Sequence, residues 1–184
     1  LTYDTLSSIV VYNDGSGNFT DQNAVTLPYV ALNDGRTTVS NIDTLDFNSD
    51  GLLDLLITHA STSEYDGRYV QALQNTGQLF IDVTADRMGS QETTISTSPS
   101  GTNSYAHTNT SLLYDLTGDG HLDLFVPSAA SITENAPIFY INDGNNRFDS
   151  TNWTTSLETV GGPSGGISFM EDINDDGIQD ILFG

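Results

Sequence analysis

The hydrophobic positions of this chain fall in short runs separated by clusters of Gly, Asn, Asp and Ser. Runs such as 9–12 (Ile-Val-Val-Tyr) and 138–141 (Ile-Phe-Tyr-Ile) have the length and the β-branched and aromatic side chains that are typical of strands. Hydrophobic residues at helical spacing are nearly absent. The pattern therefore predicts an all-β fold built from short strands joined by turns.

Three segments share a turn in which an Asn is followed by a Gly and then by a Phe. These segments, termed the asparagine turns, occupy residues 13–19, 75–80 and 142–148. Turns of the Asn-Gly and Asp-Gly type between hydrophobic runs are strong hairpin signals. Each asparagine turn is therefore expected to join two antiparallel strands, and residues 33–35 (Asn-Asp-Gly) predict a further hairpin.

An acidic pattern alternates with the asparagine turns and also occurs three times. It reads D-x-[DNT]-x-D-G-x-x-D and is followed by three hydrophobic residues. We term these segments the first, second and third acidic loops; they occupy residues 46–54, 115–123 and 172–180. Because a repeated pattern is the signature of a repeat architecture, the chain is expected to consist of similar structural units.

The spacing of the acidic loops defines the expected units. The loops begin 69 and 57 residues apart, and the 13 residues from the third loop onward together with the 45 residues before the first make 58. This predicts one propeller domain, or part of one, over 1–184, with repeat units at about 46–114, 115–171 and 172–184 joined with 1–45. The longer unit contains a Ser/Thr-rich stretch at 89–111, which we predict to be an extended surface loop.

A unit of about 57 residues has room for four short strands, the size of one β-propeller blade. The predicted architecture is therefore a set of four-stranded antiparallel sheets, about three of them in this chain. Three blades do not close a ring, since propellers have about four to eight. Either further blades lie outside these 184 residues or another copy of the chain completes the ring.

Each acidic loop offers five oxygen ligands if positions 1, 3, 5 and 9 give side chains and position 7 gives its carbonyl. Such ligands suit Ca²⁺ better than Mg²⁺, and Gly at position 6 permits a sharp turn with positive φ. An EF-hand loop would have Glu at position 12, where this chain has Ile57, Val126 and Phe183. The alternative is an Asp-Gly turn closed by Asx hydrogen bonds, which does not require four oxygen side chains at alternate positions.

With these loops the chain resembles the FG-GAP/VCBS-type repeats, the blades of integrin-α-like β-propellers. Residues 180–184 (Asp-Ile-Leu-Phe-Gly) are similar to the Phe-Gly end of that motif, and residues 80–84 to a segment that follows the hairpin in bacterial members. The resemblance implies one Ca²⁺ per acidic loop, about three in all, on the outer edge of each blade.

The resemblance also implies the ligands, with Leu52, His121 and Ile178 contributing their carbonyls. The implied set is Asp46, Asn48, Asp50, Leu52 and Asp54; Asp115, Thr117, Asp119, His121 and Asp123; and Asp172, Asn174, Asp176, Ile178 and Asp180. The second loop departs from the pattern at Thr117, which offers a neutral hydroxyl where Asp or Asn is usual. We expect this site to be the weakest, or to keep an extra water.

The composition restricts the class of partner. The chain has 25 acidic residues against 4 basic ones, a net charge of −21, and no Lys. This excludes a nucleic-acid backbone binder and argues against docking on an anionic membrane, and no hydrophobic run is long enough to span a bilayer. Ten of the 25 acids lie in the acidic loops, where they repel one another unless a cation is bound.

Other chemistry is weakly indicated. The absence of Cys excludes disulfides, a thiolate nucleophile and a Cys-based zinc site. Residues 162–166 match G-x-S-x-G, but no His follows them and no helical pattern is visible, so no catalytic residue is assigned. Three N-x-S/T triplets, at Asn18, Asn109 and Asn152, are glycosylation acceptors if the protein is exported in an organism that glycosylates asparagine.

Together these features predict a non-enzymatic, calcium-stabilised β-propeller module at the cell surface or outside the cell, for adhesion, ligand binding or surface assembly. Extracellular Ca²⁺ is millimolar and suits weak sites. The expected partners are copies of the chain, in a ring or filament, or a glycan or surface protein. Two alternatives remain: a carbohydrate-binding propeller with Trp153 or Tyr105 in pockets between blades, and an accessory part of a larger exported enzyme.

Overall fold

The computed structural model describes residues 8–29, 37–46, 48–61, 68–88, 111–126, 138–145, 147–151 and 168–183. These segments contain twelve strands and one helix of four residues, α1 (Thr84–Arg87). The strands that pair are antiparallel throughout the described segments. The prediction of an all-β fold is confirmed.

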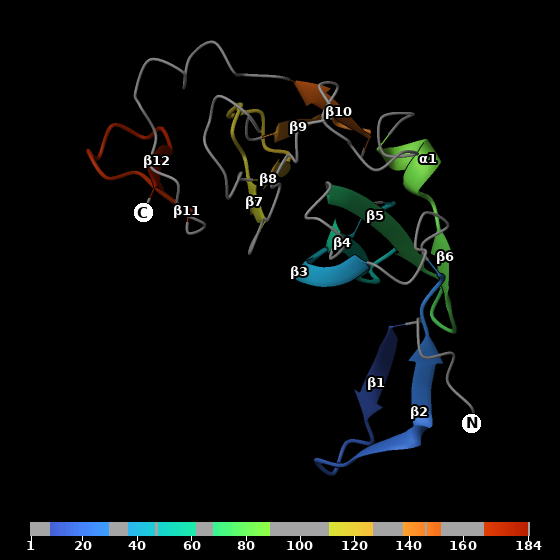
Figure 1. Ribbon diagram of the computed structural model, residues 1–184. Helices are drawn as coiled ribbons and strands as arrows, with labels where there is room; N and C mark the ends of the chain where they lie inside the picture. Colours follow the sequence, from blue (N-terminus) through green and yellow to red (C-terminus); the bar gives the residue numbers. More distant parts are fainter. Residues whose placement is uncertain are drawn as a thin grey trace.

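Two four-stranded sheets, termed the first and second full sheets, form the middle of the molecule (Figure 1). The first contains β3 (Thr37–Leu45), β4 (Asp54–Ser61), β5 (Arg68–Asn75) and β6 (Phe80–Asp82). The second contains β7 (Leu112–Tyr114), β8 (Asp123–Val126), β9 (Ile138–Asn142) and β10 (Phe148–Thr151). In both, the strands lie side by side in chain order, as expected for a propeller blade.

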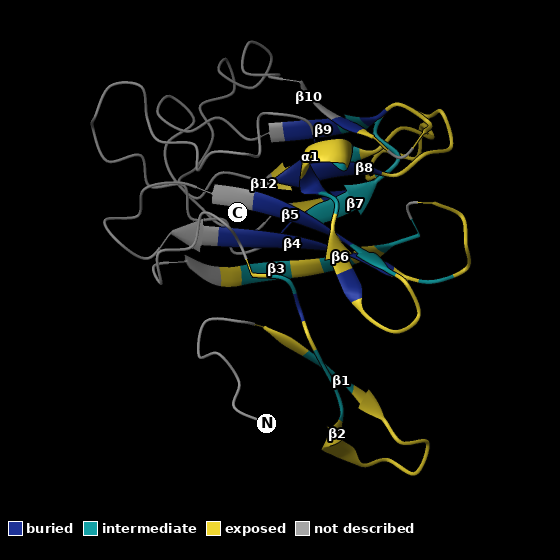
Figure 2. Cartoon of the chain, turned by 90° about the vertical axis from the view of Figure 1, so that its right-hand side faces the viewer, coloured by how far each residue is buried: buried dark blue, intermediate teal, exposed yellow. Residues whose placement is uncertain are grey.

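Two smaller sheets of two strands each accompany the full sheets. One pairs β1 (Ile9–Asn13) with β2 (Phe19–Thr26), and the other pairs β11 (Ser168–Glu171) with β12 (Asp180–Phe183). Figure 2 shows the β1–β2 pair on one side of the first full sheet and strands of the second full sheet on the other. The described chain thus forms a row of sheets in chain order.

The acidic loops and the asparagine turns take regular places in these sheets. Each acidic loop joins the first two strands of a sheet, and each asparagine turn joins two strands that pair as a hairpin. The three predicted asparagine hairpins are confirmed. The further hairpin predicted at 33–35 and the stretch 89–110 lie outside the described residues. The sheets are offset by one strand from units counted loop to loop, because the strand before each loop belongs to the same sheet.

The full sheets are hydrophobic on both faces because each is packed between two neighbours. On β4, Leu56 packs in one cluster with Leu124 and Tyr140 of the second full sheet. The adjacent Leu55 and Ile57 pack in another cluster with residues of the β1–β2 pair. Successive side chains of a strand point to opposite faces. A run of consecutive hydrophobic residues therefore serves two cores.

The second full sheet has the same arrangement on its far side. Phe125 and Phe139 pack there against Met170 of β11, and all three side chains are at most 1% exposed. The two phenylalanine ring centroids lie 4.7 Å apart with the rings tilted by 32°. Ile181 of β12 is packed against the same cluster. The β11–β12 pair therefore covers the face of the second full sheet that is opposite to the first.

A partly buried polar cluster connects β3 to the residue before β7. Asn41 Nδ2 donates to the Ser111 carbonyl at 3.0 Å and to Asp43 Oδ2 at 3.0 Å. Ser111 Oγ donates to Asp43 Oδ2 at 2.5 Å and accepts from Thr58 Oγ1 at 3.1 Å. Burial raises the pKa of the Asp43 carboxyl, and the hydrogen bonds from Ser111 and Asn41 only partly oppose this. Ionisation of Asp43 therefore lowers the stability of the folded chain.

We expect Asp43→Asn to leave the free energy of unfolding at pH 7 unchanged or to raise it slightly, because burial opposes the charge of this carboxyl and solvent screens part of that effect. The folded pKa of Asp43 lies above the unfolded value, so its ionisation lowers stability as the pH rises through that window. The gain from the variant should shrink when the pH is lowered to the unfolded pKa of 3.8. Urea unfolding at both pH values measures it.

Asp14→Asn is the control for this prediction. Hydrogen bonds from the Asn18 side chain and from the backbone N–H groups of Ser16 and Asn18 lower the pKa of the exposed Asp14 carboxyl. The contribution of Asp14 is therefore present above its unfolded pKa and is lost as the pH falls. The two variants should change stability in opposite directions between pH 7 and 3.8. Equal pH dependence of the two variants would show that the charge of Asp43 carries no cost.

Candidate functional site

Among the residues that the structure describes, the three acidic loops share the same left-handed backbone positions. Each passes twice through the left-handed region, at positions 4 and 6 of the pattern. Position 6 has φ of 84° to 90° and is Gly in all three; position 4 is Ser49 (58°), Gly118 (74°) and Asp175 (65°). The sequence predicted the positive φ at position 6, where only Gly is unstrained. The sequence does not predict the positive φ at position 4, because three different residue types occupy that position.

The Asp at position 1 closes each loop onto its own backbone. Asp46 Oδ1 accepts the N–H of Asp50 at 3.1 Å, and its Oδ2 accepts the N–H of Gly51 at 2.9 Å. Asp115 accepts the same two bonds at 3.1 and 2.8 Å, and Asp172 accepts them at 3.0 and 2.7 Å. All three carboxylates are half-buried. One side chain therefore fixes the tight part of each turn.

The residues at positions 3 and 5 are exposed and line the outside of the loop. The carboxylate at position 5 accepts the N–H of position 7 in every loop. These bonds run from Leu52 to Asp50 (2.8 Å), from His121 to Asp119 (2.9 Å) and from Ile178 to Asp176 (2.8 Å). At position 3, Asn48 and Asn174 Oδ1 accept the N–H of position 5 at 3.2 and 3.0 Å. Thr117 takes this place in the second loop and is exposed.

The Asp at position 9 belongs to the strand that follows the loop. Asp54 and Asp123 are 0% exposed, whereas Asp180 is half-buried. Asp123 Oδ2 accepts the N–H of Leu116, position 2 of the same loop, at 2.8 Å. Asp180 Oδ2 accepts the N–H of Ile173 in the same way at 3.1 Å. The carboxylate at this position thus closes the loop from the strand side.

Two asparagines that the sequence assigned only to hairpins complete this arrangement. Asn75 donates its N–H to Asp54 Oδ1, and Asn142 donates its N–H to Asp123 Oδ1, both at 2.7 Å. Their side-chain Nδ2 atoms donate to the carbonyls of the residues before those aspartates, at 3.1 and 3.2 Å. The signal was present in the sequence, since these asparagines follow the first Asp of their loops by 29 and 27 residues.

The loop also packs on the asparagine turn of the same sheet. A Cβ on Gly77 would lie 3.6 Å from Leu52 Cδ1, and a Cβ on Gly144 would lie 3.0 Å from His121 Nε2. Both glycines have positive φ, 82° and 79°. The side chain at position 7 therefore covers the turn glycine. Loop and turn form one unit at the end of each full sheet.

The side-chain donors of the acidic loops are oxygens. The oxygens come from Asp, Asn and Thr side chains, a set that suits a hard cation such as Ca²⁺. A carboxylate oxygen that accepts one N–H keeps a second lone pair for a cation. Within the described segments no three Asp, Glu or His side chains converge closely enough to hold a metal by themselves. The loop hydrogen bonds are also those of an Asx-type turn, so the donor set fits calcium while the bonds fit both interpretations.

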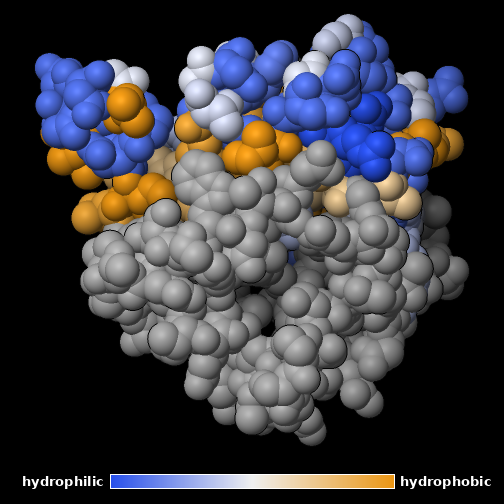
Figure 3. All heavy atoms as spheres, turned by 90° about the horizontal axis from the view of Figure 1, so that it is seen from above, coloured by the Kyte–Doolittle hydropathy of each residue, from blue (hydrophilic) through white to orange (hydrophobic). Residues whose placement is uncertain are grey.

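Figure 3 shows hydrophilic residues gathered along one side of the molecule, above a band of hydrophobic residues. The second and third acidic loops lie close together, separated by a hollow of about 490 Å³ that residues 114–118 and 177–179 line. These two loops therefore share one region of the surface.

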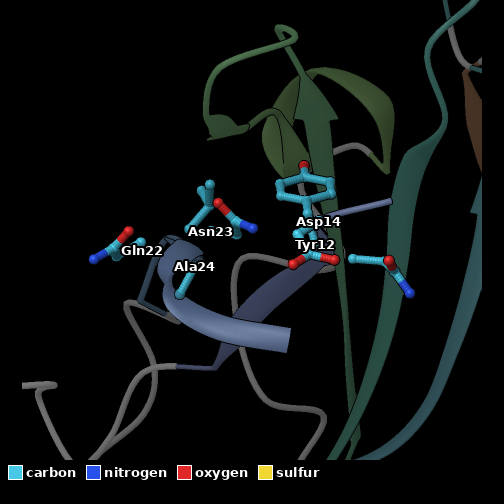
Figure 4. Close-up of a pocket in the computed structure, with 7 residues that line it drawn as sticks. Tyr12, Asp14, Gln22, Asn23 and Ala24 are labelled. Atoms are coloured by element: carbon cyan, nitrogen blue, oxygen red, sulfur yellow. The ribbon is translucent and has the colours of Figure 1, made fainter. Parts of the chain in front are cut away.

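A second hollow, of about 530 Å³, lies over the β1–β2 pair (Figure 4). Its lining is Tyr12, Asn13, Asp14 and residues 22–25. Asp14 Oδ1 accepts the N–H groups of Ser16 and Asn18, and its Oδ2 accepts Asn18 Nδ2. The polar groups here largely serve the turn itself, so we assign no ligand to this hollow.

The remaining predicted positions are placed as follows. Asn18 is exposed on the asparagine turn between β1 and β2. Asn109, Asn152, Tyr105, Trp153 and residues 162–166 lie outside the described residues. Helix α1, the helix of the described segments, is far too short to cross a membrane.

Comparison with known proteins places part of this geometry in a family. Residues 115–183 match the family model described as an FG-GAP-like repeat. The match starts at the first residue of the second acidic loop and runs to the last residue of β12, so it includes two of the three loops. No curated protein and no solved structure matches the chain.

Proposed function

We propose that the chain is a non-enzymatic β-propeller-type module that binds Ca²⁺ in its acidic loops. The match of residues 115–183 to an FG-GAP-like repeat, which indicates an FG-GAP-type repeat protein, supports this proposal. The observation that carries the proposal is the repetition of one loop geometry in three separate sheets. The loop N–H groups occupy only part of the bonding capacity of the loop carboxylates, and the same set of oxygens with lone pairs for a cation recurs in all three loops.

The balance of charge supports a bound cation. The acidic loops hold ten carboxylates and no Arg or Lys. Like charges at such short spacing repel one another, and each loop adds at least three of them. Backbone N–H groups offset part of this repulsion but carry no net charge. A divalent cation would offset the remainder, as bound ions are the largest local charges in such sites.

The residues that would hold the ion are those at positions 1, 3, 5 and 9 together with the carbonyl at position 7. In the first loop these are Asp46, Asn48, Asp50, Asp54 and Leu52. The ion would supply charge neutralisation and would fix the connection between the first two strands of a sheet. Its role is structural, with no reaction assigned to it.

The module is proposed to act outside the cell, in adhesion or surface assembly. FG-GAP repeats are typical of extracellular or surface proteins, and millimolar calcium there matches sites with few charged ligands. The excess of acidic residues suits a solvated surface that binds cations and repels nucleic acid.

Calcium titration by calorimetry tests the proposal. We expect about three sites per chain, with Mg²⁺ binding much more weakly because it requires strict octahedral geometry. Asp50→Ala or Asp176→Ala should each remove one site, since each deletes a charged ligand of one loop. Thr117→Ala should weaken binding less, because it deletes a neutral hydroxyl.

The matched control is Asp21→Ala, which removes an exposed carboxylate of β2 outside the acidic loops. It should leave the number of sites unchanged. Absence of binding at millimolar Ca²⁺, or the same loss from Asp21→Ala as from Asp50→Ala, would contradict the proposal.

A further inference from the structure

The two smaller sheets correspond to the two halves of a full sheet. In each full sheet the first two strands are joined by an acidic loop and the last two by an asparagine turn. The β11–β12 pair with the third acidic loop has the form of the first half. The β1–β2 pair with the turn 13–19 has the form of the second half. Both full sheets separate them in this structure (Figure 1).

In each full sheet, a hydrogen bond joins the half with the acidic loop to the half with the asparagine turn, and the two smaller sheets lack this bond among the described residues. Asp54 accepts the N–H of Asn75, and Asp123 accepts the N–H of Asn142, each at 2.7 Å. These two aspartates are fully buried. Asp180 is the third aspartate at this position, and it is only half-buried. Among the described residues, no asparagine of a turn bonds to it.

The packing of the acidic loop on the asparagine turn differs in the same way between the full and the smaller sheets. In the full sheets Leu52 and His121 cover the turn glycines. Ile178 is the third residue at this position, and it is 68% exposed. Gly15 is the equivalent glycine of the asparagine turn 13–19, and a Cβ built on it would meet no atom within 4 Å. Ile178 and Gly15 therefore occupy the same positions in loop and turn as Leu52 with Gly77 and His121 with Gly144, but they do not contact each other.

The hydrophobic faces of the two smaller sheets are also incomplete. Phe80 and Phe148, which end the asparagine turns of the full sheets, are 6% and 0% exposed. Phe19 ends the remaining asparagine turn, 13–19, and is 65% exposed. Two residues after the position-9 aspartate, Phe125 is 0% exposed, whereas Leu182 in the same place is 54% exposed. Each smaller sheet therefore presents a face that a full sheet buries.

We propose that β12 of one chain pairs with β1 of a second copy, so that the β11–β12 pair and the β1–β2 pair together form one four-stranded sheet between two molecules. The inference rests on the propeller-type arrangement in the proposed function, but not on calcium. The completed sheet would lie between the second full sheet of one copy and the first full sheet of the other. Phe19 and Leu182 would then each be covered, as their equivalents are.

The full sheets also supply the register of this pairing. Leu56 lies opposite Ala72, and Phe125 lies opposite Phe139, where the partners stand three residues before the turn asparagine. The same rule places Leu182 opposite Val10 of the second copy. Asn13 then stands where Asn75 and Asn142 stand, with its N–H beside Asp180.

The contact is heterologous, because it joins different ends of two identical chains. Two copies joined at both ends close a ring of six sheets, within the range of about four to eight found in propellers. An open series of copies gives a filament. In either case the edges of β12 and β1, which have no partner strand among the described residues, become paired and can no longer template unspecific pairing.

Charge opposes the association. Each copy carries a net charge of −21, so two copies repel at low ionic strength. Salt screens this repulsion beyond about 8 Å at physiological ionic strength. The experiment is therefore done at that ionic strength or above, with calcium present.

Light scattering after size exclusion, at increasing concentrations of the 184-residue chain, measures the mass. We expect at least twice the 19.8 kDa of one chain. Leu182→Glu and Phe19→Glu should each raise the dissociation constant at least about tenfold, since each buries a charge in the contact. Both positions are exposed in the single chain, so its unfolding midpoint should stay the same. Leu79→Glu, at a 49% exposed position on another turn, is the matched control and should associate like the unchanged chain.

Mixing the two variants tests the head-to-tail geometry. Phe19→Glu damages one end and Leu182→Glu the other, so a mixture retains one intact pair of ends. We expect the mixture to form dimers and nothing larger, while each variant alone stays monomeric. The chain has no cysteine, so Leu182→Cys and Val10→Cys can be mixed to test the register. They should form a disulfide-linked dimer, and Leu182→Cys with Leu79→Cys should not.

A monomer at every concentration, or equal association of Leu79→Glu and Leu182→Glu, would overturn this inference. These results are separate from the calcium titration. Calcium binding by a strictly monomeric chain would overturn the pairing and leave the proposed function. Head-to-tail association without calcium binding would do the reverse.

Discussion

Chelating calcium should lower the midpoint of thermal unfolding by about 10 °C. A ligand that binds only the folded state stabilises it by RT ln(1 + [L]/Kd). At free calcium of about ten times Kd this is about 1.4 kcal/mol per site, or about 4 kcal/mol for three sites. For a chain of this length each kcal/mol shifts the midpoint by about 2–4 °C.

The measurement is a calorimetric or circular-dichroism melt in excess calcium, in excess EGTA, and after calcium is restored. Magnesium at the same concentration should restore little of the midpoint, which separates site binding from general screening of the −21 charge. A melt that EGTA leaves unchanged would refute structural calcium in this protein. Full rescue by magnesium would show that screening is sufficient.

Asp123→Ala should destabilise the protein by about 2–4 kcal/mol even in EGTA. Asp123 is fully buried and accepts the N–H groups of Leu116 and Asn142. Truncation removes the acceptor from the N–H of Leu116 in the loop and from the buried N–H of Asn142 in β9. A buried donor without a partner costs more than a typical hydrogen bond contributes. Urea unfolding in EGTA isolates this cost from any contribution of the cation.

Asp119→Ala, in the same acidic loop, is the matched comparison. Asp119 is exposed, and its carboxylate accepts the N–H of His121 at 2.9 Å. In EGTA its loss should therefore cost much less than the loss of Asp123. In calcium both variants should lose the stabilisation by the second loop. Equal costs in EGTA would mean that burial of Asp123 contributes nothing beyond the loop bonds.

The all-β fold and the three asparagine hairpins were predictable because each depends on local sequence. A turn such as 142–148 specifies its own hairpin through the Asn142 side chain, which accepts the N–H of Gly144 at 3.0 Å. The four-strand size of the sheets followed from the spacing of the acidic loops, which sets how much chain each sheet receives.

The link between loop and turn was not predictable in the same way. Asn75 and Asn142 reach the position-9 aspartates across the sheet, and such contacts depend on strand register rather than on neighbouring residues. The cluster of Asp43 and Ser111 joins residues 68 apart, and no local pattern marks either side chain. Sequence thus revealed the repeated parts, and the structure revealed what connects them.

The packing of each full sheet between two neighbours also determines how the molecule unfolds. Leu56 packs in one core and Leu55 in the next, so β4 couples the first full sheet to the sheets on both sides of it. Each sheet of the described chain therefore packs mainly against its neighbours in the row. Stability in such a row is approximately a sum of nearest-neighbour terms. Within the described residues of a single chain, each end sheet packs against one neighbouring sheet, so amide hydrogens there should exchange with solvent through local openings more readily than in the middle of the row.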